Sequence, residues 1–231
     1  MVFTKHDARN TTKPSSFHST TRNLPIILFD IMDTVVRDPF YRDVPAFFGM
    51  SFDELIECKH PTAWIEFEKG ITDEVELAKT FFKDGRPLDL EGLKNCMRKG
   101  YYYVEGVEEL LYVLKDNNYE MHAFTNYPIW LADIHLSQTL RKAGALCTGY
   151  DLIDLINGKR KPNPEFYLEV VSHLKVDPGS CIFVDDRIRN VEAAKEVGMI
   201  GLHFKNADSL RQDLSLMGID ISTKQTNLQQ Q

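Results

Sequence analysis

Short apolar runs recur along the chain and alternate with longer segments that are apolar on one side only. Each run has the length and the aliphatic composition of a strand that is covered on both faces. The runs are LPIILFD (24–30), EMHAFTN (120–126), CIFVDD (181–186) and IGLHF (200–204). Strands that alternate with helices predict an α/β fold with a parallel, doubly wound sheet.

The segments between these runs carry apolar stripes at helical spacing, as amphipathic helices do. The stripes consist of Val107, Leu110, Leu111 and Leu114 in one segment and of Phe166, Tyr167, Val170, Val171 and Leu174 in another. Gly198 follows EAAKEV at a place where a glycine is expected to end a helix.

Residues 39–103 interrupt the alternation. They contain helical patterns such as SFDELIECK and TDEVELAKTFF, but no comparable apolar strand. The simplest account is an all-helical insert after the first strand, which divides the chain into a core domain (24–38 and 104–220) and a helical cap (39–103). The insert is rich in aromatic residues, which more often build a helical core than a platform for a planar ligand.

The two ends of the chain differ from the rest. Residues 1–23 are rich in Ser and Thr, carry basic side chains and contain one acid, Asp7. This composition predicts either a disordered N-terminus or an organelle transit segment. Residues 221–231 show no apolar pattern and are predicted to form a flexible tail.

Composition and charge narrow the class of protein. The net charge of −7 and the pI near 5.5 argue against a nucleic-acid partner. No apolar run approaches the roughly 18 residues that a membrane span needs, so no membrane partner is expected. Cysteines 58, 96, 147 and 181 lie far apart without a C-x-x-C pair, which predicts reduced thiols and no zinc site. The sequence does not determine the oligomeric state.

Polar residues gather where the predicted strands end, and ligands of open parallel sheets bind beyond those ends. Asp30 ends the first run, and Thr125 and Asn126 end the second. Asp185 and Asp186 end the run at 181–186, and the segment GKRKPNPEFY adds Lys159, Arg160 and Lys161. Together these groups can hold a hard cation, an anionic substrate and a nucleophile.

Four motifs in a fixed order carry a family resemblance. They are D-x-x-x-T at 30–34, Thr125, KPNPEF at 161–166 and DD-x-x-x-N at 185–190. In order and spacing they resemble the haloacid dehalogenase-like hydrolases over about residues 24–220. The resemblance implies a Rossmann-like core with a C1-type cap where the helical insert stands. Within this superfamily, FDIMDTVVRDPFYRDVPAFFGM, CKHPTAWIEFEKG, HAFTNYPIW and GKRKPNPEFYLEVV are similar to the flavin mononucleotide (FMN) phosphatases of plant chloroplasts.

The resemblance implies a Mg²⁺ site at the acidic end of the sheet. The side chains of Asp30 and Asp186 and the backbone carbonyl of Met32 would bind the ion. Asp185 would lie next to these ligands and help to hold them in place, and Asn190 would position the acidic loop.

The resemblance also implies roles in chemistry and in substrate binding. Asp30 would be the nucleophile that becomes an aspartyl-phosphate, and Lys161 would neutralise charge on the nucleophile and the phosphate. Thr125 would donate a hydrogen bond to a phosphoryl oxygen, beside Asn126. In the cap, His60 and Trp64 would contact the substrate.

Met32 departs from the usual phosphatase motif of the superfamily, which has a second Asp two residues after the nucleophile. That Asp protonates the leaving alkoxide and later deprotonates the attacking water, and a thioether does neither. General acid–base catalysis contributes roughly 10²–10⁴ in rate, so the sequence predicts a slow enzyme rather than an inactive one. Asp33 is an alternative acid, but a carboxylate that caps the turn is the favoured interpretation.

Three hypotheses about function follow. The first is a Mg²⁺-dependent phosphatase that hydrolyses FMN to riboflavin and phosphate, in the chloroplast if residues 1–23 are a transit segment and otherwise in the cytoplasm. The second is a phosphatase for another small metabolite, such as a sugar phosphate or a nucleotide. The third is a catalytically weak protein that binds a phosphorylated ligand, and only Met32 favours it. The acidic pair Asp185 and Asp186 favours phosphate over haloacid chemistry, because carbon–halogen displacement needs no metal.

Overall fold

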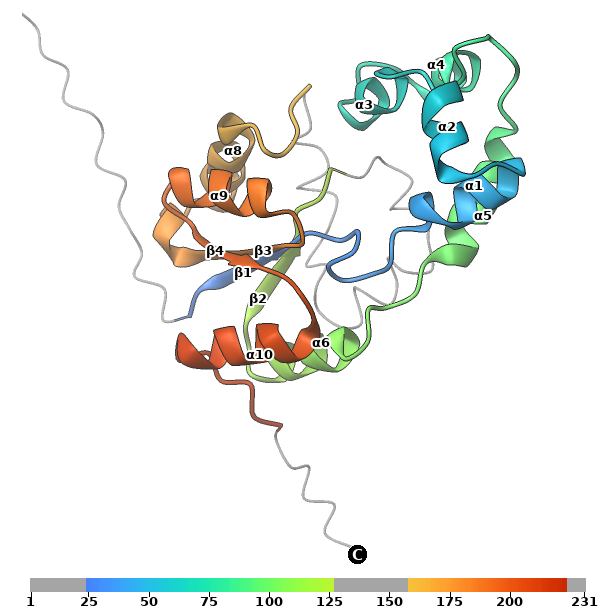
Figure 1. Ribbon diagram of the computed structural model, residues 1–231. Helices are drawn as coiled ribbons and strands as arrows, with labels where there is room; N and C mark the ends of the chain where they lie inside the picture. The colour runs from blue at the N-terminus through green and yellow to red at the C-terminus, as the bar shows by residue number, and fades with distance from the viewer. Residues whose placement is uncertain (1–23, 127–157, 224–231) are drawn as a thin grey trace, which may run out of the picture.

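The computed structural model describes residues 24–126 and 158–223, which contain a four-stranded parallel sheet (Figure 1). The strands are β1 (Ile26–Phe29), β2 (Glu120–Ala123), β3 (Cys181–Asp185) and β4 (Ile200–His203), in the order β2-β1-β3-β4. In the register, Ile26 lies opposite both Glu120 and Cys181. All four predicted strands are present, so the predicted α/β class with a parallel sheet is confirmed.

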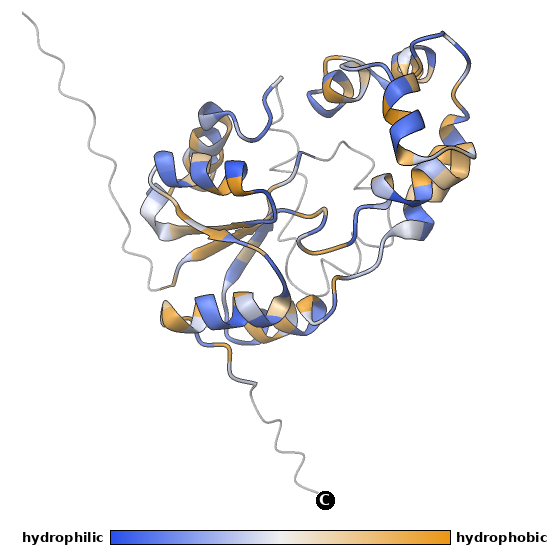
Figure 2. Cartoon of the chain, in the orientation of Figure 1, coloured by the Kyte–Doolittle hydropathy of each residue, from blue (hydrophilic) through white to orange (hydrophobic). Residues whose placement is uncertain are grey.

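Helices cover both faces of this sheet, because successive side chains of a strand point to opposite faces. On one face, Ile26 and Leu28 pack with residues of α8 (Pro164–Leu174) and α9 (Ile188–Glu196). On the other face, Ile27 and Phe29 pack with residues of α6 (Val107–Asp116) and α10 (Ala207–Leu216). Figure 1 shows these helix pairs on opposite sides of the strands. In Figure 2 the central strands are largely hydrophobic, whereas the flanking helices carry both kinds of residue. A short 3-10 helix, η4 (Pro178–Ser180), precedes β3.

Residues 39–103, here called the helical insert, consist of helices and loops, with one isolated antiparallel bridge between Lys59 and Phe82. Its elements are η1 (Pro39–Tyr41), α1 (Asp43–Phe48), α2 (Phe52–Cys58), α3 (Ala63–Glu68), α4 (Glu74–Thr80) and α5 (Leu90–Gly100). Local sequence sets several of the boundaries. Ser51 and Glu54 form a reciprocal capping box at the start of α2, and Gly49 ends α1 in the left-handed conformation. Figure 1 shows this group of helices to one side of the sheet.

The insert leaves and rejoins the core at adjacent backbone positions. The N–H of Arg37 donates to the carbonyl of Tyr102 at 3.0 Å, and the N–H of Val104 donates to the carbonyl of Val35 at 3.0 Å. Between these bonds, Val36 pairs with Tyr103 in an antiparallel bridge. The two connecting segments therefore form a short paired neck.

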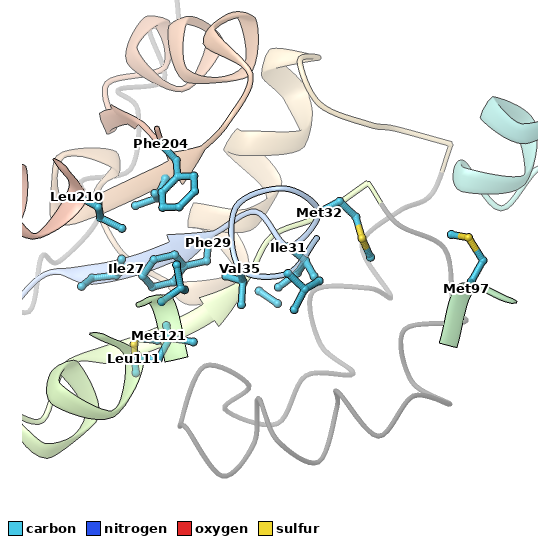
Figure 3. Packing of buried hydrophobic residues seen from close by; sticks show 14 of the residues in the cluster. Ile27, Phe29, Ile31, Met32, Val35, Met97, Leu111, Met121, Phe204 and Leu210 are labelled. Carbon is cyan, nitrogen blue, oxygen red and sulfur yellow. The ribbon is translucent and has the colours of Figure 1, made fainter. Parts of the chain in front are cut away.

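One apolar cluster runs from the sheet through the neck into the insert. It joins β1 to the loop that follows it and to the helices of the insert. In Figure 3, Met32 of that loop and Met97 of α5 reach toward the same region from the two sides. Both side chains are almost completely buried.

Some predictions lie outside the described residues. These include the transit-like or disordered segment 1–23, most of the tail at 221–231, and Cys147. Within the described ranges, Cys58, Cys96 and Cys181 form no disulfide with one another. No helix in the described part of the chain has the length and apolar character needed to cross a membrane.

Candidate active site

A single tight turn follows β1 and presents Asp30 at the end of the strand. The N–H of Asp30 donates to the carbonyl of Val184 at 2.9 Å, which extends the pairing of β1 with β3 by one residue. Asp33 has a left-handed backbone with φ of 57°. Its Oδ1 accepts the N–H of Asp38 at 2.9 Å, so the Asp33 carboxylate stabilises the turn.

Lys161 is buried beside Asp30 and binds groups from several segments. Its side chain is 1% exposed, and its Nζ donates to Oδ1 of Asp30 at 2.8 Å and to Oδ2 of Asp185 at 2.7 Å. It also donates to the carbonyl of Phe124 at 2.7 Å, just beyond β2. The side chain of Asn126 binds both the N–H of Lys161, at 2.7 Å, and its carbonyl, at 3.1 Å. The segment after β2 thus fixes the lysine between the two acidic loops.

Asp185 and Asp186 are neighbours with different environments. Asp185 is completely buried and accepts hydrogen bonds from Lys161, from the backbone N–H of Arg187 and from the side chain of Asn190. Asp186 has a buried Oδ1 with no hydrogen-bond partner among the described residues. Its backbone N–H donates to Oγ1 of Thr34 at 3.0 Å, which ties the two acidic loops together.

These carboxylates suit a divalent cation. Oxygen atoms of Asp30, Asp185 and Asp186 lie within 4.8 Å of one another. Hard cations such as Mg²⁺ prefer carboxylate oxygens, and a buried acceptor without a donor is costly unless a cation or water satisfies it. Since Asp185 already accepts several hydrogen bonds, Asp30 and Asp186 are the better placed ligands. The role of the Met32 carbonyl stays a prediction.

Burial and mutual repulsion shape the electrostatics of the site. Burial raises the pKa of Asp186 to about 7, with further contributions from the charges of Asp30 and Asp185. Burial also raises the pKa of Asp30, in spite of the nearby ammonium group of Lys161. Burial alone would lower the pKa of Lys161, but the carboxylates of Asp30 and Asp185 outweigh it, so that this pKa is raised. The cluster holds more negative charge than one lysine cancels, which favours a metal ion.

A cavity of about 300 Å³ opens beside these residues and is lined from both the core and the insert. This volume is at the small end of the range of ligand sites. Asp30, Thr125, Asn126 and Lys161 line it from the core. Asp38 lines it from the linker, the short segment between the turn after β1 and the insert. The insert contributes Phe40, Tyr41, Ile56, Lys59, Trp64, Ile65, Glu68 and Met97. The remaining lining residues are Met32, Arg160, Arg187, Arg189 and Asn190.

Two contacts join the insert to the core around this cavity. Nη2 of Arg160 lies 2.8 Å from Oε2 of Glu68 in an ion pair, and Nε1 of Trp64 donates to the other oxygen of Glu68 at 2.9 Å. Arg187 donates to the hydroxyl of Tyr41 at 3.2 Å. The insert is therefore held over the acidic site by side chains that themselves line the cavity.

The structure brings most of the predicted site residues together around the cavity, whereas His60 lies apart from it. His60 is not among the described residues that line the cavity. Its Nδ1 accepts the backbone N–H of Ala63 at 3.2 Å at the start of α3. Its contact with the substrate stays a prediction. Asn126 does line the cavity, but its amide is engaged by the backbone of Lys161. These bonds position the lysine, and the contact of Asn126 with the substrate stays a prediction.

Sequence analysis missed Asp38, Glu68, Arg187 and Met97, which also line the cavity. Asp38 stands immediately before Pro39, a pattern typical of a helix start, and its side chain does cap η1. Nothing in that local pattern indicates that the same carboxylate faces a site formed by distant strands.

Comparison with known proteins gives the family. Residues 25–198 match the model of the haloacid dehalogenase-like hydrolases. The chain is 59% identical over 204 residues to the chloroplastic flavin mononucleotide hydrolase 1 of Arabidopsis thaliana, covering 88% of this chain and 82% of the relative. It is 30% identical over 167 residues to the sesquiterpene phosphatase astK of Aspergillus oryzae, covering 68% of this chain and 80% of the relative.

Solved structures share the fold at low sequence identity. A haloacid dehalogenase-like (HAD-like) family hydrolase from Porphyromonas gingivalis has a TM-score of 0.66 at 18% identity. The match covers 85% of this chain and 98% of that chain. A HAD family enzyme of Bacteroides thetaiotaomicron, solved in complex with magnesium and inorganic phosphate, has a TM-score of 0.61 at 18% identity, with 79% and 95% covered. With the family model spanning most of the chain, this protein belongs to the haloacid dehalogenase-like hydrolases.

Proposed function

We propose that this chain is a Mg²⁺-dependent phosphatase that hydrolyses FMN to riboflavin and phosphate. The observation that carries the proposal is the 59% identity, over 88% of the chain, to a relative named as an FMN hydrolase. The buried arrangement of Asp30, Lys161 and the acidic pair supports it, because a carboxylate can approach a phosphate dianion only where cations cancel the repulsion.

In this proposal Asp30 attacks phosphorus and forms an aspartyl-phosphate, which water then hydrolyses. Lys161 keeps the attacking oxygen in place and neutralises charge on the phosphoryl group, and Thr125 donates a hydrogen bond to a phosphoryl oxygen. Asp30 and Asp186 would hold the Mg²⁺, with Asp185 and the Met32 carbonyl completing its surroundings. The ion supplies charge neutralisation at the phosphoryl oxygens.

The helical insert serves as a C1-type cap in this proposal, and its side chains select the substrate. Trp64 lines the cavity and offers an aromatic surface for the planar isoalloxazine ring. The ion pair between Glu68 and Arg160 holds that tryptophan over the site.

A substrate panel tests the proposal. Phosphate release is measured from FMN, a hexose phosphate, a nucleoside monophosphate and a prenyl phosphate, with Mg²⁺ and with EDTA. The prenyl ester is included because the more distant relative is a sesquiterpene phosphatase. We expect the kcat/KM for FMN to exceed the others by about tenfold or more, and EDTA to abolish turnover.

Each alternative has its own outcome. A higher kcat/KM for another ester would overturn the choice of substrate, but not the phosphatase. Full activity in Asp30→Asn would overturn the mechanism. Calorimetric binding of FMN without turnover over hours would indicate a ligand-binding protein.

The proposed location is the chloroplast, with residues 1–23 as a transit segment. The chloroplastic relative supports this location. A fluorescent protein fused to residues 1–23 should enter chloroplasts, and a cytosolic signal from that fusion would contradict the proposal.

A further inference from the structure

Phosphate ester hydrolysis needs a proton for the leaving alkoxide, and the residue two positions after Asp30 cannot supply one. Met32 has a thioether side chain, which carries no transferable proton. Three carboxyl groups line the cavity among the residues that the structure describes: Asp30, Asp38 and Glu68. The proton donor is to be sought among them, since a candidate general acid must reach the substrate.

Two of these carboxyl groups are already committed. Asp30 is bound to Lys161 and is the proposed nucleophile. Glu68 forms the ion pair with Arg160 and accepts the indole N–H of Trp64. Asp38 differs, because only its Oδ1 is engaged, by the backbone N–H of Phe40 at 2.9 Å. Its Oδ2 accepts no hydrogen bond within residues 24–126 and 158–223.

The backbone around Asp38 is fixed from both sides. Its N–H donates to Oδ1 of Asp33 in the turn after the nucleophile, and its side chain caps η1 at the start of the insert. The carboxyl group therefore stands on the linker between Asp30 and the cap helices, with one oxygen held and the other available. This is the preorganisation that a proton-transferring group requires.

We propose that Asp38 is the general acid and base of this enzyme and performs the proton transfers that Met32 cannot. The inference rests on the proposed phosphatase function, and it applies to any phosphate ester of an alcohol.

Two proton transfers by Asp38 complete one turnover. As the Asp30 oxygen bonds to phosphorus, the bond between phosphorus and the ester oxygen breaks, and the protonated Asp38 gives its proton to that oxygen. The alcohol then leaves. Next, the Asp38 carboxylate takes a proton from a water molecule, whose oxygen bonds to phosphorus while the bond to Asp30 breaks. Inorganic phosphate is released, and Asp38 is again protonated for the next cycle.

The environment of Asp38 matches this role. Burial raises its pKa to about 6. The N–H of Phe40 and the charge of Arg187 oppose the increase, whereas the charges of Asp33 and Asp30 add to it. A carboxyl group with a pKa near the working pH is suited to donate and accept protons in turn.

Two substrates with different leaving groups test the proposal in the full-length enzyme with Mg²⁺. The leaving group of FMN is the alkoxide of riboflavin, which needs a proton. The leaving group of 4-nitrophenyl phosphate is a stabilised nitrophenolate, which does not. In Asp38→Asn, which keeps an acceptor for the Phe40 N–H, single-turnover riboflavin release should fall about 100-fold or more. The first equivalent of nitrophenolate should appear at close to the wild-type rate, followed by slow turnover because the second step still needs a base.

Further variants and pH separate this role from a structural one. Wild-type riboflavin release should decline above about pH 6 as Asp38 loses its proton, and Asp38→Asn should lack that decline. Asp38→Ser keeps a helix-capping oxygen and should behave like Asp38→Asn. Asp53→Asn, an exposed acid outside the cavity lining, is the control and should retain the wild-type difference between the two substrates.

Two results would overturn the proposal. One is an equal loss of the first turnover with both substrates, which would make Asp38 a structural residue. The other is riboflavin release in Asp38→Asn within about threefold of the wild-type rate, well short of the effect of general acid catalysis. If the wild-type enzyme hydrolyses neither ester, the proposed function itself is wrong. If it prefers another alkyl phosphate, that ester replaces FMN in the same test.

Discussion

The side-chain nitrogen of Lys161 lies 2.8 Å from the carboxylate of Asp30, although the two residues are 131 positions apart in sequence. Asp185 accepts a second hydrogen bond from the same nitrogen, so one ammonium group joins the loops after β1 and β3. A buried charge of this kind is stable only because its partners surround it. The same arrangement brings the proposed nucleophile and its neutralising cation together before substrate arrives.

Replacement of Lys161 by Met should therefore damage both stability and activity. Asp30 and Asp185 would be left as buried charges without their partner, at a cost of about 3–5 kcal/mol in the free energy of unfolding. Urea unfolding in metal-free buffer measures the loss, and phosphate release should fall to background. Lys159→Met is the control, since Lys159 pairs with Glu169 near the surface and should contribute less than about 1 kcal/mol. Equal stability of Lys161→Met and wild type would contradict the proposed importance of this pair.

Met32→Asp should lower the free energy of unfolding and raise the turnover of FMN. Met32 is 8% exposed within the apolar cluster, so an added carboxylate is expected to lower the free energy of unfolding by about 1–3 kcal/mol. The same carboxylate stands two residues after the nucleophile and should raise the turnover of FMN.

The clearest effect of Met32→Asp is expected in an Asp38→Asn background, where the new acid should restore about tenfold or more of the lost rate. Met32→Leu in the same background is the control and should restore nothing. A folded Met32→Asp enzyme with lower turnover would show instead that the apolar contact with the insert matters for catalysis.

Trp64→Ala should weaken the binding of FMN without affecting a small substrate. Loss of a stacking surface for the isoalloxazine ring costs about 1–3 kcal/mol, which corresponds to a rise in KM of about 5- to 150-fold. The KM for 4-nitrophenyl phosphate should change little. Trp64→Phe retains an aromatic face but loses the hydrogen bond to Glu68, so its KM for FMN should lie between those of wild type and Trp64→Ala. An equal rise in KM for both substrates would show that Trp64 acts on the cavity as a whole.

The ion pair between Glu68 and Arg160 should help to hold the insert against the core. A double-mutant cycle with Glu68→Gln and Arg160→Met isolates the coupling, and we expect about 1–2 kcal/mol because both side chains are largely buried. Each single variant should raise the KM for FMN more than it lowers kcat. Arg37→Met with Asp43→Asn, which breaks an ion pair away from the cavity lining, is the matched control cycle. A coupling energy near zero would contradict a role in holding the insert.

The parts of the fold that local sequence determines could be predicted. The four strands and the helices α6 and α8 follow from the hydrophobic period. The strands bury both faces, and each of these helices buries one apolar stripe against the sheet. The position of Asp30 at the end of β1 and of Asp185 at the end of β3 follows from the same pattern. Parallel strands bring their carboxyl ends to one edge, so the acidic cluster was within reach of sequence analysis.

The residues that enter the site from the insert could not be predicted in the same way. His60 and Trp64 are close in sequence, yet Trp64 lines the cavity while His60 caps the start of α3. Glu68 follows Trp64 by one helical turn and reaches the core only because the insert folds back onto it. Such placements depend on tertiary packing between distant segments, which a local pattern does not contain.

The paired neck at Val36 and Tyr103 has a consequence for how new specificities can arise in this architecture. Because the outgoing and returning segments are bonded to each other, we expect that the helices beyond them can be exchanged as one unit whose ends need only match one antiparallel bridge. Replacement of residues 40–101 by the equivalent segment of a relative should confer the relative's substrate preference without altering the sheet. Asp38 lies between the bridge and residue 40, where the graft begins, so the proposed proton-transfer group would remain with the recipient protein.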